Sequence, residues 1–172
     1  MLKVLVPSDG SPNSLYAIRH VIDEFNKGQG LEIHLLNAQP PFSKLITEYS
    51  SKSARMEFHQ EQADAALLET RRMLDTAGIP YTVHSEVGNK VDCIVDAARR
   101  LHCDLILMST ARKSSLVRLI ENSVTNQVLE KTSVPVEVIP GEAASKLERI
   151  GIPAGVGAGA GAGIVALWMA SS

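Results

Sequence analysis

Short apolar segments alternate with longer segments of helical periodicity along the first 140 residues, and this alternation constrains the fold more than any other feature. Apolar runs between turn residues are typical of buried strands, whereas apolar residues that recur every three to four positions indicate amphipathic helices. The expected strands are Leu2–Pro7, Leu31–Ala38, Tyr81–Val87, Asp104–Met108 and Val134–Ile139, and the expected helices are 12–28, 53–77, 91–102 and 123–131. This order predicts an α/β fold, a five-stranded, mostly parallel sheet with helices on both faces.

A polar turn, residues 8–12, follows the first expected strand. Serine is a preferred helix cap and proline suits the first helical position, so we expect Ser11 to cap a helix that begins at Pro12. Asp9 in this turn has two interpretations. Its carboxylate accepts hydrogen bonds from the sugar hydroxyls of a ligand, or it closes an Asx turn that holds Gly10 and Ser11 in place. Residues 39–52 are expected to form a polar loop.

Length, charge and the cysteine and histidine residues narrow the function classes. A chain of 172 residues favours one main domain, and a net charge of −2 gives no basis for nucleic-acid binding. Cys93 and Cys103 lack zinc or redox spacing, so we expect buried, reduced thiols in a cytoplasmic protein. The five histidines are scattered without the spacing of metal ligands, and no metal site is predicted.

The C-terminal residues 150–172 contain no charged side chain and are rich in glycine and alanine. About twenty uncharged residues can span a bilayer as a helix, so one interpretation is a membrane anchor from Ile150 to Ala170 that tethers the domain to the cytoplasmic side of the inner membrane. The other interpretation is a flexible tail, because glycine lowers both hydrophobicity and helix propensity. Both interpretations place a domain over residues 1–140, a linker over 141–149 and a tail over 150–172.

The segment from Asp104 to Thr125 has the pattern of a phosphate site: a strand, a basic loop rich in hydroxyls, and a helix start. A helix N-terminus offers free N–H groups and the positive end of its dipole. In parallel sheets, ligands bind beyond the carboxyl ends of the strands. The residues that follow the first and fourth strands are therefore expected to face each other across one crevice. However, this segment contains no glycine.

Four sequence blocks resemble the successive blocks of a universal stress protein domain. These blocks are Val4–Ser11, Val87–Asn89, Asp104–Ser109 and Val134–Val138. The resemblance covers residues 1 to about 140 and implies a Rossmann-like sheet of the adenine-nucleotide alpha-hydrolase type. It also implies a homodimer joined through the last strand, Val134–Ile139. Many members of the family bind ATP, and others do not.

In the ATP-binding members, three glycines follow the fourth strand, and the resemblance places them at Ser109, Arg112 and Asn122-Ser123. All three glycines are replaced, which removes the close approach of backbone to phosphate that glycine permits. The resemblance also implies that Asp9 lies near the ribose or base and that Ala38 faces the adenine. The complete set of implied nucleotide contacts is Pro7, Asp9, Ala38, Met108, Ser109, Arg112, Asn122, Ser123, Val124 and Thr125.

The sequence therefore predicts a non-enzymatic stress-response protein that acts by binding, with weak or absent ATP binding. One alternative is an ATP-binding stress sensor in which the guanidinium of Arg112 replaces the lost N–H donors. A second is a membrane-tethered interaction module. The third, a nucleotide-hydrolysing enzyme, is disfavoured because the chain has no Walker A lysine motif and no evident magnesium carboxylate other than Asp9.

Overall fold

The computed structural model describes residues 1–112 and 123–143 of the chain. Its elements follow the order β1 (Leu2–Pro7), α1 (Ser14–Asn26), β2 (Leu31–Gln39), α2 (Lys44–Tyr49), α3 (Lys52–Thr76), β3 (Tyr81–Val87), α4 (Lys90–Arg100), β4 (Leu105–Arg112), α5 (Val124–Lys131) and β5 (Val136–Ala143). The five expected strands and four expected helices all occur, β1 and β3 with the predicted bounds and the others with shifted ends, and α2 is additional.

The five strands form one sheet in the order β3-β2-β1-β4-β5, and every pairing is parallel. From β1 the chain adds β2 and β3 on one side and then returns to add β4 and β5 on the other. Strand order therefore reverses between β1 and β4. This point is where open parallel sheets bind their ligands.

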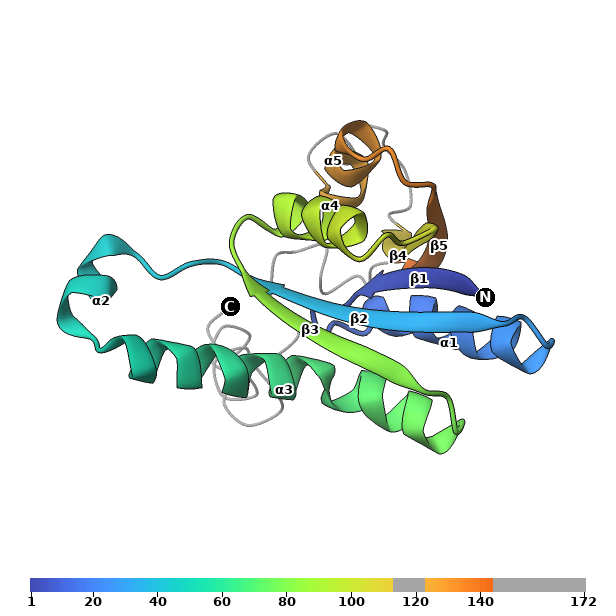
Figure 1. Cartoon of the computed structure of the whole chain (residues 1–172), viewed down its shortest axis with the longest axis horizontal. Coiled ribbons are helices and arrows are strands. Elements are labelled where there is room, and N and C mark those ends of the chain that lie inside the picture. Colours follow the sequence, from blue (N-terminus) through green and yellow to red (C-terminus); the bar gives the residue numbers. More distant parts are fainter. Residues whose placement is uncertain (113–122, 144–172) are drawn as a thin grey trace, which may run out of the picture.

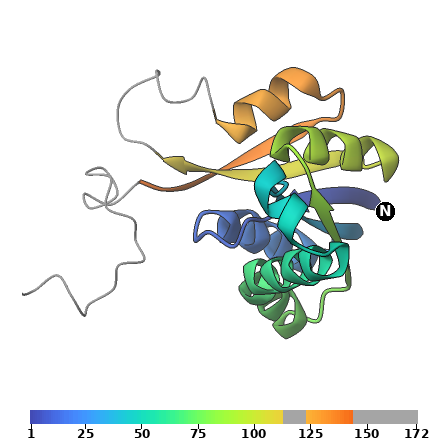
Figure 2. The same ribbon diagram turned by 90° about the vertical axis from the view of Figure 1, so that its left-hand side faces the viewer.

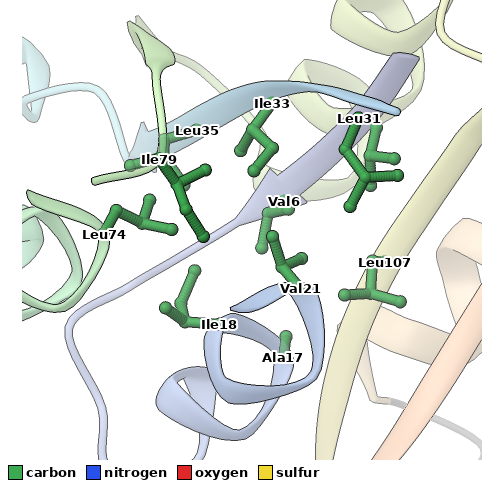
Figure 3. Packing of buried hydrophobic residues seen from close by; sticks show 11 residues of the cluster. Val6, Ala17, Ile18, Val21, Leu31, Ile33, Leu35, Leu74, Ile79 and Leu107 are labelled. Atoms are coloured by element: carbon green, nitrogen blue, oxygen red, sulfur yellow. The ribbon is translucent and has the colours of Figure 1, made fainter. Parts of the chain in front are cut away.

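Helices cover both faces of the sheet, as the sequence predicts (Figures 1 and 2). Helices α1 and α3 lie on one face, and α4 and α5 lie on the other. Alternate residues of β1 enter the two cores: Val4 and Val6 pack under α1 and α3, whereas Leu5 packs under α4 and α5. Figure 3 shows the first core, where Val6 and Ile33 meet Ile18 and Val21 of α1. Burial on both faces explains why β1, β2 and β4 read as continuous apolar runs.

The predicted start of the first helix is wrong: α1 begins at Ser14, not Pro12. Asn13 occupies the N-cap position and makes no side-chain cap hydrogen bond. Ser11 lies in a turn ahead of the helix, where its carbonyl accepts hydrogen bonds from the backbone N–H (3.0 Å) and the hydroxyl (2.7 Å) of Ser14. Its hydroxyl also accepts from the Ser14 N–H (3.3 Å), so Ser11 does bond the first residue of the helix.

The expected polar loop 39–52 contains the short helix α2. Ser43 caps this helix by accepting a hydrogen bond from the backbone N–H of Ile46 (3.5 Å). None of the residues of α2 is buried. A helix of six residues without a buried face leaves no apolar period in the sequence, which is why the pattern missed it.

The predicted ends of the last two strands are also wrong. Ser109–Arg112 continue strand β4 instead of starting a loop, and β5 runs to Ala143, beyond Ile139. Ser109 pairs with Ile139 and Thr110 pairs with Pro140, with a bulge between Thr110 and Arg112. Pro140 indicates a strand end, but β5 is at an edge of the described sheet, where proline is tolerated.

Candidate functional site

A cleft lies at the carboxyl ends of β1, β2 and β4, at the reversal of strand order. It contains about 620 Å³ of empty space, part of which is open to solvent. Seven predicted site residues line it: Pro7, Asp9, Ala38, Met108, Ser109, Val124 and Thr125. Ser123 adjoins this lining at the start of α5, whereas Asn122 and the side chain of Arg112 lie outside the described part. The cleft thus joins residues that are more than 100 positions apart in the sequence.

The turn after β1 presents the carboxylate of Asp9 at the mouth of the cleft. One carboxylate oxygen accepts a hydrogen bond from the backbone N–H of Ser11 (3.0 Å), so the Asx turn is present. Asp9 is also exposed and lines the cleft, so the turn holds a carboxylate that a ligand can reach. Gly10 has φ +78°, and a Cβ there would lie 2.8 Å from the carbonyl oxygen of Ala66 in α3. The turn therefore requires glycine at this position.

Buried hydroxyls tie the floor of the cleft to the surrounding elements. The Ser8 hydroxyl donates to that of Ser14 (3.1 Å) and lies 3.2 Å from the hydroxyl of Thr70, which is fully buried on α3. The side-chain amide of Asn37 donates to the Ser8 carbonyl (2.9 Å). Since these four residues come from β1, α1, α3 and β2, the floor is fixed by contacts that cross the fold. Sequence reasoning treated Ser8 and Ser14 as turn or cap residues and missed this network.

The first position of the expected glycine motif is held by a side-chain hydrogen bond. The Ser109 hydroxyl donates to the backbone carbonyl of Asn13 at the start of α1. Asn13 in turn lies against β5, where a Cβ at Gly141 would come within 2.5 Å of the Asn13 side-chain oxygen. The serine that replaces glycine thus joins β4 to the N-terminus of α1.

The start of α5 keeps the helix cap that the sequence predicts. Ser123 has an extended backbone, and its hydroxyl accepts a hydrogen bond from the backbone N–H of Asn126 (3.1 Å). Val124 and Thr125 follow it in the first turn and line the cleft. The frame of the phosphate segment is therefore present on the helix side.

The structure adds Lys90 to the site, the first residue of α4. Among the described residues that line the cleft, it is the only cation. Asn89 caps the helix by accepting hydrogen bonds from the N–H groups of Val91 (3.0 Å) and Asp92 (3.3 Å), and this fixes where Lys90 emerges. The signal in the sequence was the position of Lys90 just after the cap that follows the third strand. The other lining residues that the prediction missed are Ser8, Ser11, Asn13, Ser14, Leu36 and Ile94.

The described residues hold neither a metal cluster nor a membrane-spanning helix. Within 1–112 and 123–143, no cluster of three or more His, Cys, Asp or Glu side chains is placed to hold a metal ion. Cys93 and Cys103 are free and buried, and burial raises the pKa of both thiols. None of the helices in the described part of the chain is long and apolar enough to span a bilayer. The expected anchor, Ile150–Ala170, lies outside the described residues.

Comparison with known proteins agrees with this architecture. Residues 1–140 match the family model of the universal stress protein family. The universal stress protein MJ0531 of Methanocaldococcus jannaschii is 31% identical over 142 residues, which cover 80% of this chain and 81% of the relative.

Solved structures show the same fold. Protein MJ0577 superposes with a TM-score of 0.65 at 25% identity, covering 83% of this chain and 97% of that one. A universal stress protein in complex with cAMP superposes with a TM-score of 0.62 at 22% identity, covering 80% and 96%. On the family match and the MJ0531 relative together, this chain belongs to the universal stress protein family.

Proposed function

We propose that this chain is a non-enzymatic stress protein that acts by binding the adenosine part of a nucleotide, with little contribution from a triphosphate. The observation that carries this proposal is the meeting of Pro7, Asp9 and Ala38 with Met108 in one cleft. The apolar side chains supply walls for a planar base, and the carboxylate of Asp9 supplies an acceptor for ribose hydroxyls. We call Pro7, Asp9 and Ala38 the base half of the cleft.

The phosphate half, Ser109 and Ser123–Thr125, supports only weak contact with a phosphate chain. The Ser109 hydroxyl already donates its proton to the Asn13 carbonyl and has no donor left for a phosphate. The Ser123 hydroxyl accepts from the Asn126 N–H and keeps its own proton, so it offers a single hydroxyl donor at the helix start. A serine side chain also keeps the backbone at Ser109 farther from a phosphate than glycine would. The relative solved with cAMP holds an adenosine nucleotide with one phosphate, and a ligand of this size suits the proposal.

The proposal contains no catalytic step. The described lining offers one carboxylate, that of Asp9, without an imidazole or thiol beside it. Phosphoryl transfer needs a metal clamp or a residue that positions the nucleophile. The same proposal places the protein in the cytoplasm, where its two free thiols stay reduced.

A homodimer through β5 is the second part of the proposal. Strand β5 is an edge of the described sheet, and an edge strand offers unpaired backbone groups to a second copy. Light scattering on the full chain should give a mass of about twice the 18.5 kDa of one chain. A mass of one chain at micromolar concentration would contradict the proposed homodimer.

Calorimetric titration of the full chain with AMP tests the binding function. We expect saturable binding of AMP and weaker binding of GMP, because the base half selects the base. ATP incubated with the protein should be hydrolysed no faster than with a heat-treated control. No AMP binding, or steady turnover of ATP, would contradict the proposal.

A further inference from the structure

A second hollow adjoins the cleft and shares three of its residues. It contains about 900 Å³ of empty space, including space open to solvent, and it is bordered by Asp9, Ala38 and Lys90, which also line the cleft. Its far side is formed by the segment 39–43, by α2 and by the first half of α3. These elements extend beyond the carboxyl end of β2 (Figure 1). We call this region the aromatic hollow.

Three ring side chains, those of Phe42, Phe58 and His59, line the aromatic hollow. Phe42 lies 4.6 Å from His59 and 5.4 Å from Phe58, measured between ring centroids. Phe42 and His59 are half-buried, and Phe58 is 46% exposed. Rings of this kind offer faces on which another planar ring can stack, and base–aromatic stacking tolerates any base.

Hydrogen bonds fix the wall that carries these rings. The His59 Nδ1–H donates to the side-chain oxygen of Gln39 (2.8 Å), and the Gln39 amide donates to the His59 carbonyl (2.8 Å). The same amide donates to the side-chain oxygen of Asn37 (3.0 Å), which is the residue whose own amide holds the Ser8 carbonyl. One chain of hydrogen bonds therefore runs from the floor of the cleft to the aromatic hollow. The wall is thus held in place before any ligand arrives.

Two charged side chains lie at the boundary between the cleft and the aromatic hollow, and they limit which ligands can extend from one into the other. Lys90 is exposed and lines both hollows, so an anionic group placed between them would meet its ammonium. Asp9 lines both as well and suits a ribose on either side of the boundary. A ligand made of a base, a ribose, a phosphate link and a second base would contact the cleft, Asp9, Lys90 and the aromatic hollow in this order.

We propose that the cleft and the aromatic hollow together take a dinucleotide, two nucleosides joined through phosphate, with the second base stacked on Phe42 and the phosphate link beside Lys90. This inference rests on the proposed adenosine site and adds the aromatic hollow to it. The second base of the dinucleotide would stack on Phe42 and its phosphate link would lie beside Lys90. A mononucleotide cannot make both of these contacts.

The test compares two probes on the full chain by calorimetric titration: AMP, and two adenosines joined 5′ to 5′ through a diphosphate. We expect the dinucleotide to bind at least about fivefold more tightly than AMP, the lower end of what one stacked base contributes. Phe42→Ala should remove this advantage and leave the affinity for AMP unchanged. Tyr49→Ala is the matched control, since Tyr49 is an aromatic residue on α2 that is 85% exposed and does not line the aromatic hollow.

Lys90→Gln provides a second variant in case Phe42→Ala fails to fold. It changes an exposed side chain and should weaken the dinucleotide more than AMP. Equal affinities for the two probes, or equal losses of both on Phe42→Ala, would overturn the inference and leave the adenosine site standing. Binding of the dinucleotide without binding of AMP would instead overturn the proposed mononucleotide function. If neither probe binds, both proposals fail.

Discussion

The base half and the phosphate half of the cleft differ in what holds their backbone. In the base half, the turn after β1 is closed by Asp9 and depends on Gly10, whose backbone lies directly against α3. In the phosphate half, glycine is absent, and the hydroxyls of Ser109 and Ser123 hold the ends of β4 and α5. One half presents an exposed acceptor, whereas the hydroxyls of the other make hydrogen bonds within the protein. The same frame thus holds two ends of the cleft whose polar groups are used differently.

Gly10→Ala should produce the largest effect on the base half. An alanine at φ +78° is strained, and its Cβ would lie 2.8 Å from backbone atoms of Ala66. We expect a loss of about 2–4 kcal/mol in the free energy of unfolding, measured with urea. Gly78→Ala is the control, because φ is +67° there but nothing lies within 4 Å, so strain alone should cost about 1 kcal/mol. Equal losses for the two variants would show that α3 does not press on the turn.

Asp9→Asn separates the turn from the ligand contact. Asparagine can still accept the hydrogen bond from the Ser11 N–H, so stability should change little. AMP affinity should fall about tenfold, because a hydrogen bond to a charged group contributes about 1.5–3 kcal/mol and a neutral acceptor recovers part of it. An unchanged dissociation constant for AMP in the calorimeter would mean that Asp9 is a turn residue only.

Ser109→Gly should affect stability more than binding. It removes the hydrogen bond to the Asn13 carbonyl and adds backbone freedom within β4, with an expected cost of about 1 kcal/mol in urea unfolding. AMP affinity should stay within about twofold, because this contact lies outside the base half. A tenfold change would correspond to about 1.4 kcal/mol of binding free energy. Ser109→Ala, which removes only the hydroxyl, distinguishes the lost hydrogen bond from the added freedom. No loss of stability in either variant would show that the hydrogen bond to Asn13 contributes nothing to the free energy of unfolding.

Ser123→Ala should also have only a small effect on binding. The variant loses a helix cap, worth about 1 kcal/mol of stability, because the Ser123 hydroxyl accepts from the Asn126 N–H, but Ser123 lies outside the base half that supplies the proposed binding energy. We therefore expect AMP affinity to change by less than about threefold, or under about 0.7 kcal/mol. A tenfold loss would place a phosphate on this helix start and erase the contrast between the two halves.

Much of this site followed from the sequence because parallel strands bring their carboxyl ends to one edge. Pro7 and Asp9 could be expected at this edge once the first strand was recognised, whereas Ala38 and Met108 were implied by the resemblance to the family. Apolar runs buried on both faces, as in β1, β2 and β4, are easy to recognise, and the alternation of strands and helices indicated the edge strands β3 and β5 as well.

The missed features depend on contacts between distant residues. Asn13 enters the site from the start of α1, through packing that no local pattern encodes, whereas Lys90 follows the Asn89 cap, which is a local signal. The helix α2 has no buried side chain and leaves no period. Strand β5 continues through Pro140 and Gly141 because β4 pairs with it and Asn13 packs on it, whereas both residues indicate a turn when the sequence is considered alone.

The most direct test of the central claim compares ATP with AMP in the natural chain and in a variant with all three glycines restored, Ser109→Gly with Arg112→Gly and Asn122→Gly. We predict that the natural chain binds ATP and AMP with dissociation constants within about threefold of each other, since the triphosphate adds less than about 0.7 kcal/mol. The variant should bind ATP at least about tenfold more tightly, with AMP unchanged. ATP binding tenfold tighter than AMP in the natural chain would contradict the claim that its phosphate half no longer serves a triphosphate.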